Sequence, residues 1–280
     1  MDSLDPHSFP AKAALETFRD EVWSFYRASG RRMPWRGIDD AYGVLVSEIM
    51  LQQTQVARVM DRWGEWMAVF PTIDALAAAP LALVLERWQG LGYNRRAVAL
   101  KRCAEEVAAR FAGALPGDPA ALVTLPGIGP ATAGAVACYA YRMPAPFIET
   151  NVRAALLHAF FADADDVPDR ALVPIAEAVW DRDDPREWGY ALTDYGAHLK
   201  RTLPNPSRRS RHHTRQSPFE GSRRQKRARL LRAVLASPGS SAEVYAEDAG
   251  VVVGDALPLL EVLAAEGFIT RSGEGWTVGG

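Results

Sequence analysis

Cysteine is scarce in this chain of 280 residues, and the two that occur, Cys103 and Cys138, do not form a Cys-x-x-Cys pair. This scarcity argues against a disulfide-bonded scaffold and favours two reduced thiols within helices. The sequence also lacks an apolar run long enough to span a bilayer. Met1 to Leu15 has no apolar core flanked by basic residues and a cleavage site, so it does not read as a signal peptide. We therefore expect a cytoplasmic protein of the bacterial-type cytosol or nucleoid, with no membrane partner.

Neither positive nor negative charge is in large excess, because the chain has 32 Lys and Arg and 34 Asp and Glu. The basic residues are unevenly placed, however: twelve of them lie between Lys200 and Arg232, with Glu220 as the single acid. Arginine dominates this stretch, and its planar fork suits phosphate. The stretch therefore favours a nucleic-acid contact. A solvated linker is the alternative.

A glycine-rich turn organises the middle of the chain. It reads Leu-Pro-Gly-Ile-Gly-Pro over residues 125–130 and is followed by a small-residue helix, expected over Ala131 to Ala140. Gly127 and Gly129 permit backbone angles that other residues avoid. Because the second helix begins at this turn, its free N–H groups and the positive end of its dipole form an anion site, typically for phosphate. A plain turn between two core helices is the alternative.

A carboxylate stands out in the next motif, which reads Ser-Glu-Ile-Met-Leu-Gln-Gln-Thr-Gln over residues 47–55, within a helix expected over Tyr42 to Met60. Glu48 lies between Val46 and Ile49, and it either faces solvent or occupies an apolar pocket. In a pocket its charged form would be disfavoured and its pKa raised. It would then be protonated near neutrality, as a general acid should be.

Together the two motifs resemble the helix-hairpin-helix DNA glycosylase superfamily, which includes endonuclease III and the adenine DNA glycosylases. The resemblance covers residues 11–200. It implies that Glu48 protonates the target base and that the Gly-Leu-Gly-Tyr sequence at residues 90–93 places Tyr93 as a wedge in the base stack. The alternative is that Tyr93 packs inside the protein. The superfamily also carries a Pro-Trp-Arg motif similar to residues 34–36, but Trp35 could equally be a core residue. The resemblance further assigns to DNA binding Gln52, Gln53, Gly127, Gly129, Ala131, Thr132 and Asn151.

Two residues depart from the superfamily pattern. Bifunctional members carry a Schiff-base lysine at the position of Ala131, so this chain should be monofunctional and use water. Members usually place a catalytic aspartate at the position of Glu149, which is longer by one methylene. Either the pocket is rebuilt around Glu149, or the target base differs. Asn151 is expected to cap a helix over Val152 to Phe161.

Relatives carry four iron–sulfur cysteines after the helix that corresponds to Trp188 to His198, and this chain has none there. His212 and His213 are typical of a solvated pair. We therefore expect no iron–sulfur cluster, no metal and no other cofactor, and the nearby arginines could contact the DNA backbone instead.

The expected fold is mainly α: a two-lobed helix-hairpin-helix DNA glycosylase fold over residues 1–215, with a C-terminal winged-helix-like module over residues 216–280. The barrel lobe spans residues 38–133, and the second lobe is formed by residues 1–37 and 134–215. In the module, three helices precede a hairpin, and the acidic middle helix, Ala242 to Ala249, favours a packing or protein-interaction role over DNA binding.

The pattern as a whole predicts a monomeric, monofunctional DNA glycosylase of base excision repair that flips a base from double-stranded DNA. Glu48 and Glu149 would be catalytic. Adenine opposite guanine or 8-oxoguanine is the first choice of target base. A thymine, uracil or other damaged-base glycosylase of the same superfamily is an alternative. A catalytically silent lesion-binding protein, in which Glu149 and Ala131 mark lost chemistry, is another.

Overall fold

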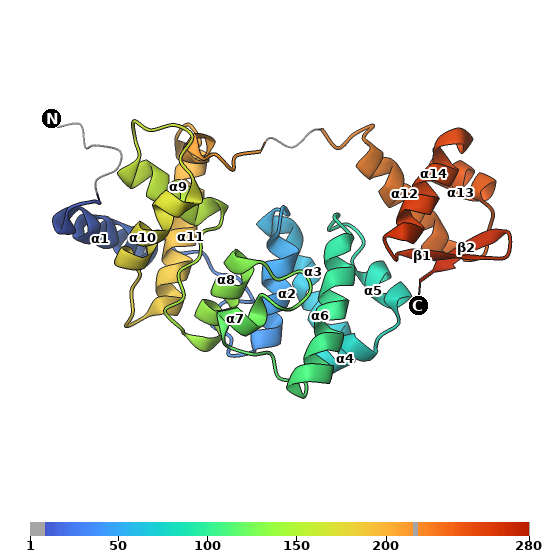
Figure 1. The fold of residues 1–280 in the computed structure, drawn as a ribbon, viewed down its shortest axis with the longest axis horizontal. Coiled ribbons are helices and arrows are strands. Elements are labelled where there is room, and N and C mark those ends of the chain that lie inside the picture. Colours follow the sequence, from blue (N-terminus) through green and yellow to red (C-terminus); the bar gives the residue numbers. More distant parts are fainter. Residues whose placement is uncertain (1–8, 215–217, 280) are drawn as a thin grey trace. The chain divides into compact units, whose positions relative to one another are not determined.

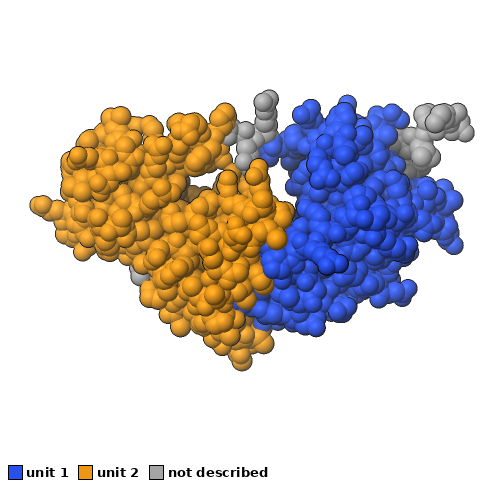
Figure 2. Space-filling model, turned by 180° about the vertical axis from the view of Figure 1, so that it is seen from behind, with its two compact units in different colours: residues 1–49, 115–215 blue, residues 50–114, 216–280 orange. Residues whose placement is uncertain are grey.

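The computed structural model describes residues 9–214 and 218–279. Over these residues the chain is mainly helical, and its two short strands lie near the C-terminal end (Figure 1). Packing divides the chain into two compact units, each assembled from two separate segments (Figure 2). Unit 1 holds residues 1–49 and 115–215, and unit 2 holds residues 50–114 and 216–280. Among the described helices, none is long and apolar enough to cross a membrane.

Unit 1 is built around α11 (Pro185–Thr202), which packs against α1 (Lys12–Ser29), α8 (Pro130–Tyr141) and α9 (Thr150–Phe160). The side chain of Asp184 caps α11, and Pro185 occupies its first turn. Gly196 allows α11 to approach α9 closely, because a Cβ at this position would lie 1.9 Å from the carbonyl oxygen of Asn151. The unit also contains α7 (Pro119–Leu122), α10 (Asp169–Val179), η1 (Pro206–Arg209) and most of α2 (Ala41–Leu51).

Unit 2 begins with α3 (Val56–Val69), α4 (Ile73–Ala78), α5 (Leu81–Arg87) and α6 (Arg95–Phe111). The buried rings of Trp66 and Trp88 meet edge to face at 5.4 Å in its core. The single helix expected over Tyr42 to Met60 is wrong, since α2 ends at Leu51 and α3 starts at Val56. The break is a turn in which Gln53 takes a left-handed backbone conformation, with φ 57°.

The C-terminal segment of unit 2 has the element order expected for the winged-helix-like module. It contains α12 (Arg223–Ala236), α13 (Ala242–Ala249) and α14 (Val253–Ala265), followed by β1 (Ile269–Ser272) paired antiparallel with β2 (Gly275–Val278). Tyr245 of α13 is fully buried, and its hydroxyl contacts the carbonyl oxygens of Ser237 and Trp276, both at 2.8 Å. This side chain therefore ties the helices to the hairpin.

The domain boundaries expected from the sequence differ from the boundaries of the two compact units. The glycine-rich turn, expected in the barrel lobe, lies in unit 1, and the C-terminal segment packs with residues 50–114. The expected domain boundaries therefore stay a prediction.

Candidate active site and nucleic-acid contacts

Glu48 is held in unit 1 on the strongly apolar helix α2, in a half-buried position. Burial is the main cause that raises its pKa, from 4.5 to about 8, and the negative charge of Glu149 raises it further, while Arg36 acts in the opposite direction. Glu48 is therefore protonated near neutral pH, as expected for a carboxylic acid in a pocket. The two carboxyl groups therefore lie near enough to affect each other's charge, although they are about a hundred residues apart in sequence.

Glu149 is the N-cap of α9, so the expectation that Asn151 would cap this helix is wrong. The Glu149 backbone is extended, and its Oε1 accepts hydrogen bonds from the backbone N–H groups of Asn151 at 2.8 Å and Val152 at 2.9 Å. Asn151 instead donates its side-chain Nδ2 to Oε2 of Glu149 at 3.2 Å. The longer acid thus folds back on the helix start, where the N–H groups favour negative charge.

Lys200 completes this arrangement, although it was not among the site residues predicted from the sequence. Its Nζ donates to Oδ1 of Asn151 at 3.1 Å, so that Lys200, Asn151 and Glu149 form one hydrogen-bonded chain. Burial lowers the pKa of Lys200, and Glu149 counteracts that effect. No local signal marks Lys200 in the sequence. It lies one turn beyond Gly196, where α11 approaches the start of α9 closely.

Arg36 of the Pro-Trp-Arg motif supports the same region. Its guanidinium donates to both oxygens of Asp194, at 2.7 and 2.9 Å, and lies 4.4 Å from the centroid of the Tyr190 ring. Burial acts to raise the pKa of Asp194, but hydrogen bonds and charge from Arg36 outweigh it and the pKa is lowered. The Tyr190 ring stacks on Tyr139 at 4.3 Å. Trp35 is buried, in agreement with the core interpretation.

The glycine-rich turn leads into α8 in unit 1. Gly127 has a φ of 78°, a region that favours glycine, and Gly129 has a φ of −89°, which any residue can adopt. A Cβ on Gly129 would meet nothing within 4 Å, so the fold itself does not require glycine there. Gly129 is the N-cap of α8 and offers no side-chain cap, while Ala131 and Thr132 are half-buried in its first turn. The turn thus leaves room for an anion to approach the helix start.

Gln52, Gln53 and Tyr93 lie together in unit 2, where Arg96 connects the two turns that carry them. The buried Arg96 guanidinium donates to the carbonyl oxygens of Met50 at 2.8 Å and Gln52 at 2.6 Å, and to those of Leu91 and Gly92 at 3.1 and 3.0 Å. Tyr93 is exposed and, like Gln53, has a left-handed backbone, with φ 48°. Strained conformations of this kind cluster at binding sites.

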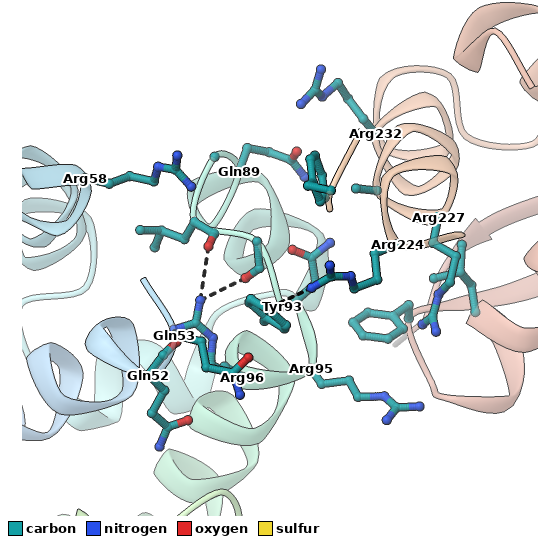
Figure 3. Close-up of a pocket in the computed structure, with 18 residues that line it drawn as sticks. Gln52, Gln53, Arg58, Gln89, Tyr93, Arg95, Arg96, Arg224, Arg227 and Arg232 are labelled. Atoms are coloured by element: carbon teal, nitrogen blue, oxygen red, sulfur yellow. Dashed lines mark hydrogen bonds between the residues drawn. The ribbon is translucent and has the colours of Figure 1, made fainter. Parts of the chain in front are cut away.

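These three residues line a cavity of about 910 Å³ in unit 2, here called the arginine cavity (Figure 3). Tyr93 lies near its middle, and α12 contributes the opposite wall. The hydroxyl of Tyr93 accepts a hydrogen bond from Arg224 at 2.7 Å. The basic residues that line the cavity are Arg58, Arg95, Arg96, Arg224, Arg227 and Arg232.

The region after α11 does not fit an iron–sulfur cluster. It presents the arginines of η1, whereas Cys103 and Cys138 are buried in separate helices of different units. Within residues 9–214 and 218–279, no group of three or more His, Cys, Asp or Glu could hold a metal ion. The expectation of no cofactor stays a prediction.

Residues 46–176 match the HhH-GPD superfamily of base excision DNA repair proteins. The chain is 46% identical over 147 residues to an adenine DNA glycosylase of Mycolicibacterium smegmatis, covering 52% of this chain and 50% of that one. For the Mycobacterium tuberculosis H37Rv enzyme of the same name, the identity is 42% over 180 residues, covering 62% and 59%. The chain thus spans between half and three fifths of the length of these relatives.

Solved structures support the HhH-GPD glycosylase fold. A thermostable thymine-DNA glycosylase superposes with a TM-score of 0.61 at 24% identity, covering 66% of this chain and 87% of that chain. Endonuclease III in a non-covalent DNA complex gives a TM-score of 0.53 at 18% identity, covering 75% and 91%. At these identities the likeness concerns the fold alone.

Proposed function

We propose that this HhH-GPD protein is a monofunctional adenine DNA glycosylase that acts on mispaired double-stranded DNA in the cytosol. The observation that carries the proposal is the convergence of Glu48, protonated near neutral pH, with Glu149 in unit 1. Hydrolysis of an N-glycosidic bond needs these two forms together: an acid for the leaving base and an anion for the developing sugar cation. The relatives named adenine DNA glycosylases supply the choice of base.

In the proposed reaction, a flipped adenine enters beside the two acids of unit 1. The protonated Glu48 donates its proton to a ring nitrogen of the base while the bond between C1′ and the base breaks. The bonding electrons leave with the base, and the positive charge that forms on the sugar is stabilised by Glu149. Water then adds to C1′ and gives its proton to the Glu48 carboxylate, which restores the acid and leaves an abasic site.

Three side chains support these steps without reacting. Asn151 and Lys200 hold Glu149 at the start of α9, which favours the interpretation that the pocket is rebuilt around the longer acid. Arg36 carries a positive charge near Glu48, anchored on Asp194. Ala131 has no amine, so no Schiff base forms at this position.

An oligonucleotide panel tests the proposal. Each duplex carries one candidate base in a defined pair, and alkali converts abasic sites into strand breaks. We expect release of adenine opposite guanine or 8-oxoguanine, and loss of release with unchanged DNA binding in the Glu48→Gln variant. Release of thymine or uracil alone would assign a different base. Selective binding without any release, equal in the wild type and Glu48→Gln, would instead indicate a silent lesion-binding protein.

A further inference from the structure

The C-terminal module contains a helix pair whose charge is opposite to that of a DNA-binding element. Helices α13 and α14 pack against each other (Figure 1). In helix-turn-helix proteins the second helix of such a pair enters the major groove, and basic side chains contact the phosphates. Residues 242–265 contain no Lys, Arg or His, and they carry five acids: Glu243, Glu247, Asp248, Asp255 and Glu261. This helix pair therefore repels a polyanion.

The outward side of α14 is apolar, as its inward side is. The inward side is buried in the module and consists of Ala256, Leu259, Leu260 and Leu263. On the outward side, Val253 and Leu257 lie one turn apart and are 53% and 44% exposed. Val252, directly before the helix, is 72% exposed. A helix that is apolar on both sides is normally buried on both, so the outward side has the character of a surface that a partner covers.

The acids beside this apolar surface are only partly neutralised. Glu261 lies one turn beyond Leu257 on the same side of α14, and no Lys or Arg among the described residues pairs with it. Asp255 pairs with Lys226 of α12 at 2.6 Å. At the end of α13, a groove of about 650 Å³ has two acids and two bases in its wall: Glu247, Asp248, Arg229 and Arg232. The bases of α12 thus balance these acids but not Glu261, so the outward side of α14 keeps a negative charge.

This charge decides among the possible occupants of the apolar surface. Two copies that met through α14 in a symmetric pair would place the same acids on both sides of the contact, and juxtaposed like charges oppose such a pair. Nucleic acid and anionic lipid are repelled for the same reason. A polypeptide segment that carries apolar side chains between Lys or Arg residues matches both the apolar surface and its charge.

We propose that Val252, Val253 and Leu257, here called the valine face, dock a basic amphipathic segment of another protein. The partner's apolar side chains cover the valine face, and its Lys or Arg pairs with Glu261. Amphipathic helices bind apolar surfaces in this way, with anchors three or four residues apart. The valine face lies outside the residues assigned to catalysis and to DNA contact, so the proposal does not depend on the proposed glycosylase function.

Two short fluorescein-labelled peptides test the valine face. One is an amphipathic helix of Leu and Lys, and the other has the same composition in a scrambled order without an apolar side. In anisotropy titrations against the full chain, we expect the amphipathic peptide to bind at least about tenfold more tightly than the scrambled one. Val253→Ser/Leu257→Ser should remove most of this preference. Val173→Ser/Leu203→Ser is the matched control, because it changes one exposed Val and one exposed Leu of unit 1.

The charge of the rim has its own variant. Glu261→Gln should weaken binding of the amphipathic peptide about threefold at low salt, as expected for the loss of one exposed ion pair. The difference from wild type should shrink as salt is added, because salt screens exposed charges. An affinity that stays the same in Glu261→Gln at low salt would overturn the pairing with Glu261.

Methyl NMR spectra of the wild type locate the peptide without relying on a variant. Shifts of the Val252, Val253 and Leu257 resonances are expected, and shifts confined to other methyl groups would overturn the proposal, as would equal binding of the two peptides. Sedimentation velocity without peptide tests self-association: a dimer that Val253→Ser/Leu257→Ser abolishes would assign the valine face to a second copy and overturn the choice of partner. Duplex DNA binding that this variant weakens, and the matched control does not, would overturn it in favour of DNA.

Discussion

At the scale of single residues, the protonation of Glu48 should set the pH range of the proposed reaction. Its pKa is raised to about 8, so the proton that leaves with the base is present at neutral pH and lost above pH 8. The single-turnover rate of base release should therefore be level up to about pH 7 and fall about tenfold per unit well above pH 8. Rapid-quench kinetics in a series of buffers measures this. A rate that keeps rising through pH 9 would contradict a general-acid role for Glu48.

Lys200 should act on the rate through Asn151 and Glu149. Lys200→Met removes the hydrogen bond to Asn151 and the positive charge near Glu149, and we expect a fall of about tenfold in the single-turnover rate, as for other losses of positioning. DNA affinity should change by less than about threefold. Lys200→Arg should restore part of the rate. Arg201→Met is the control, because it removes an exposed charge from the same helix end.

The Lys200 prediction has two further checks. The losses in Lys200→Met and Glu149→Asp should be non-additive in a double-mutant cycle, because both side chains contact Asn151. Borohydride should trap no covalent adduct with wild-type protein. An adduct that disappears in Lys200→Met would show that Lys200 is an amine nucleophile and not a positioning residue.

At the scale of elements, the two glycines before α8 should respond differently to alanine. Gly127→Ala puts a side chain on a backbone with φ 78° and should destabilise the protein by about 1 kcal/mol or more. Gly129→Ala meets open space at an ordinary φ, so the melting temperature should hold while the added methyl group weakens DNA binding at the helix start. Calorimetry and duplex titrations separate the effects. Unchanged DNA affinity in Gly129→Ala would contradict phosphate binding at this turn.

Element positions could be predicted well wherever a local signal marks them. The small-residue helix expected over Ala131 to Ala140 matches α8 to within one residue at each end, and the helix expected over Ala242 to Ala249 matches α13 with the bounds observed. The break between α2 and α3 was not foreseeable in this way. Its glutamines favour helix, and the turn depends on Arg96, which binds its carbonyl oxygens from 44 to 46 residues away.

The candidate site was predicted from sequence only in part, for a related reason. Glu48 and Glu149 stand in motifs, so they could be named, and the structure brings them together. Lys200 and the arginines of α12 belong to no motif. Their positions result from the packing of α11 on α9 and of α12 on residues 50–114, which is non-local information that one sequence does not display.

At the scale of the whole molecule, unit 2 depends on contacts between segments separated by more than a hundred residues. Glu266 is the main polar contact, since it accepts hydrogen bonds from Arg95, at 2.6 and 3.1 Å, and from Arg227. Burial acts to raise the pKa of Glu266, but these hydrogen bonds prevail and the pKa lies below its ordinary 4.5. Its contribution to stability is therefore present above pH 4.5 and is lost as pH falls further.

Replacing Glu266 by Gln should loosen the C-terminal segment from residues 50–114 without unfolding either part. Hydrogen exchange should quicken in α12 and in the turn at residues 90–94. The difference from wild type should shrink as the pH falls below 4.5 and vanish once Glu266 is protonated in the folded state as well. Asp255→Asn is the matched control, because it breaks an ion pair with Lys226 inside the module. Equal exchange in both variants at neutral pH would show that Glu266 does not hold the two segments together.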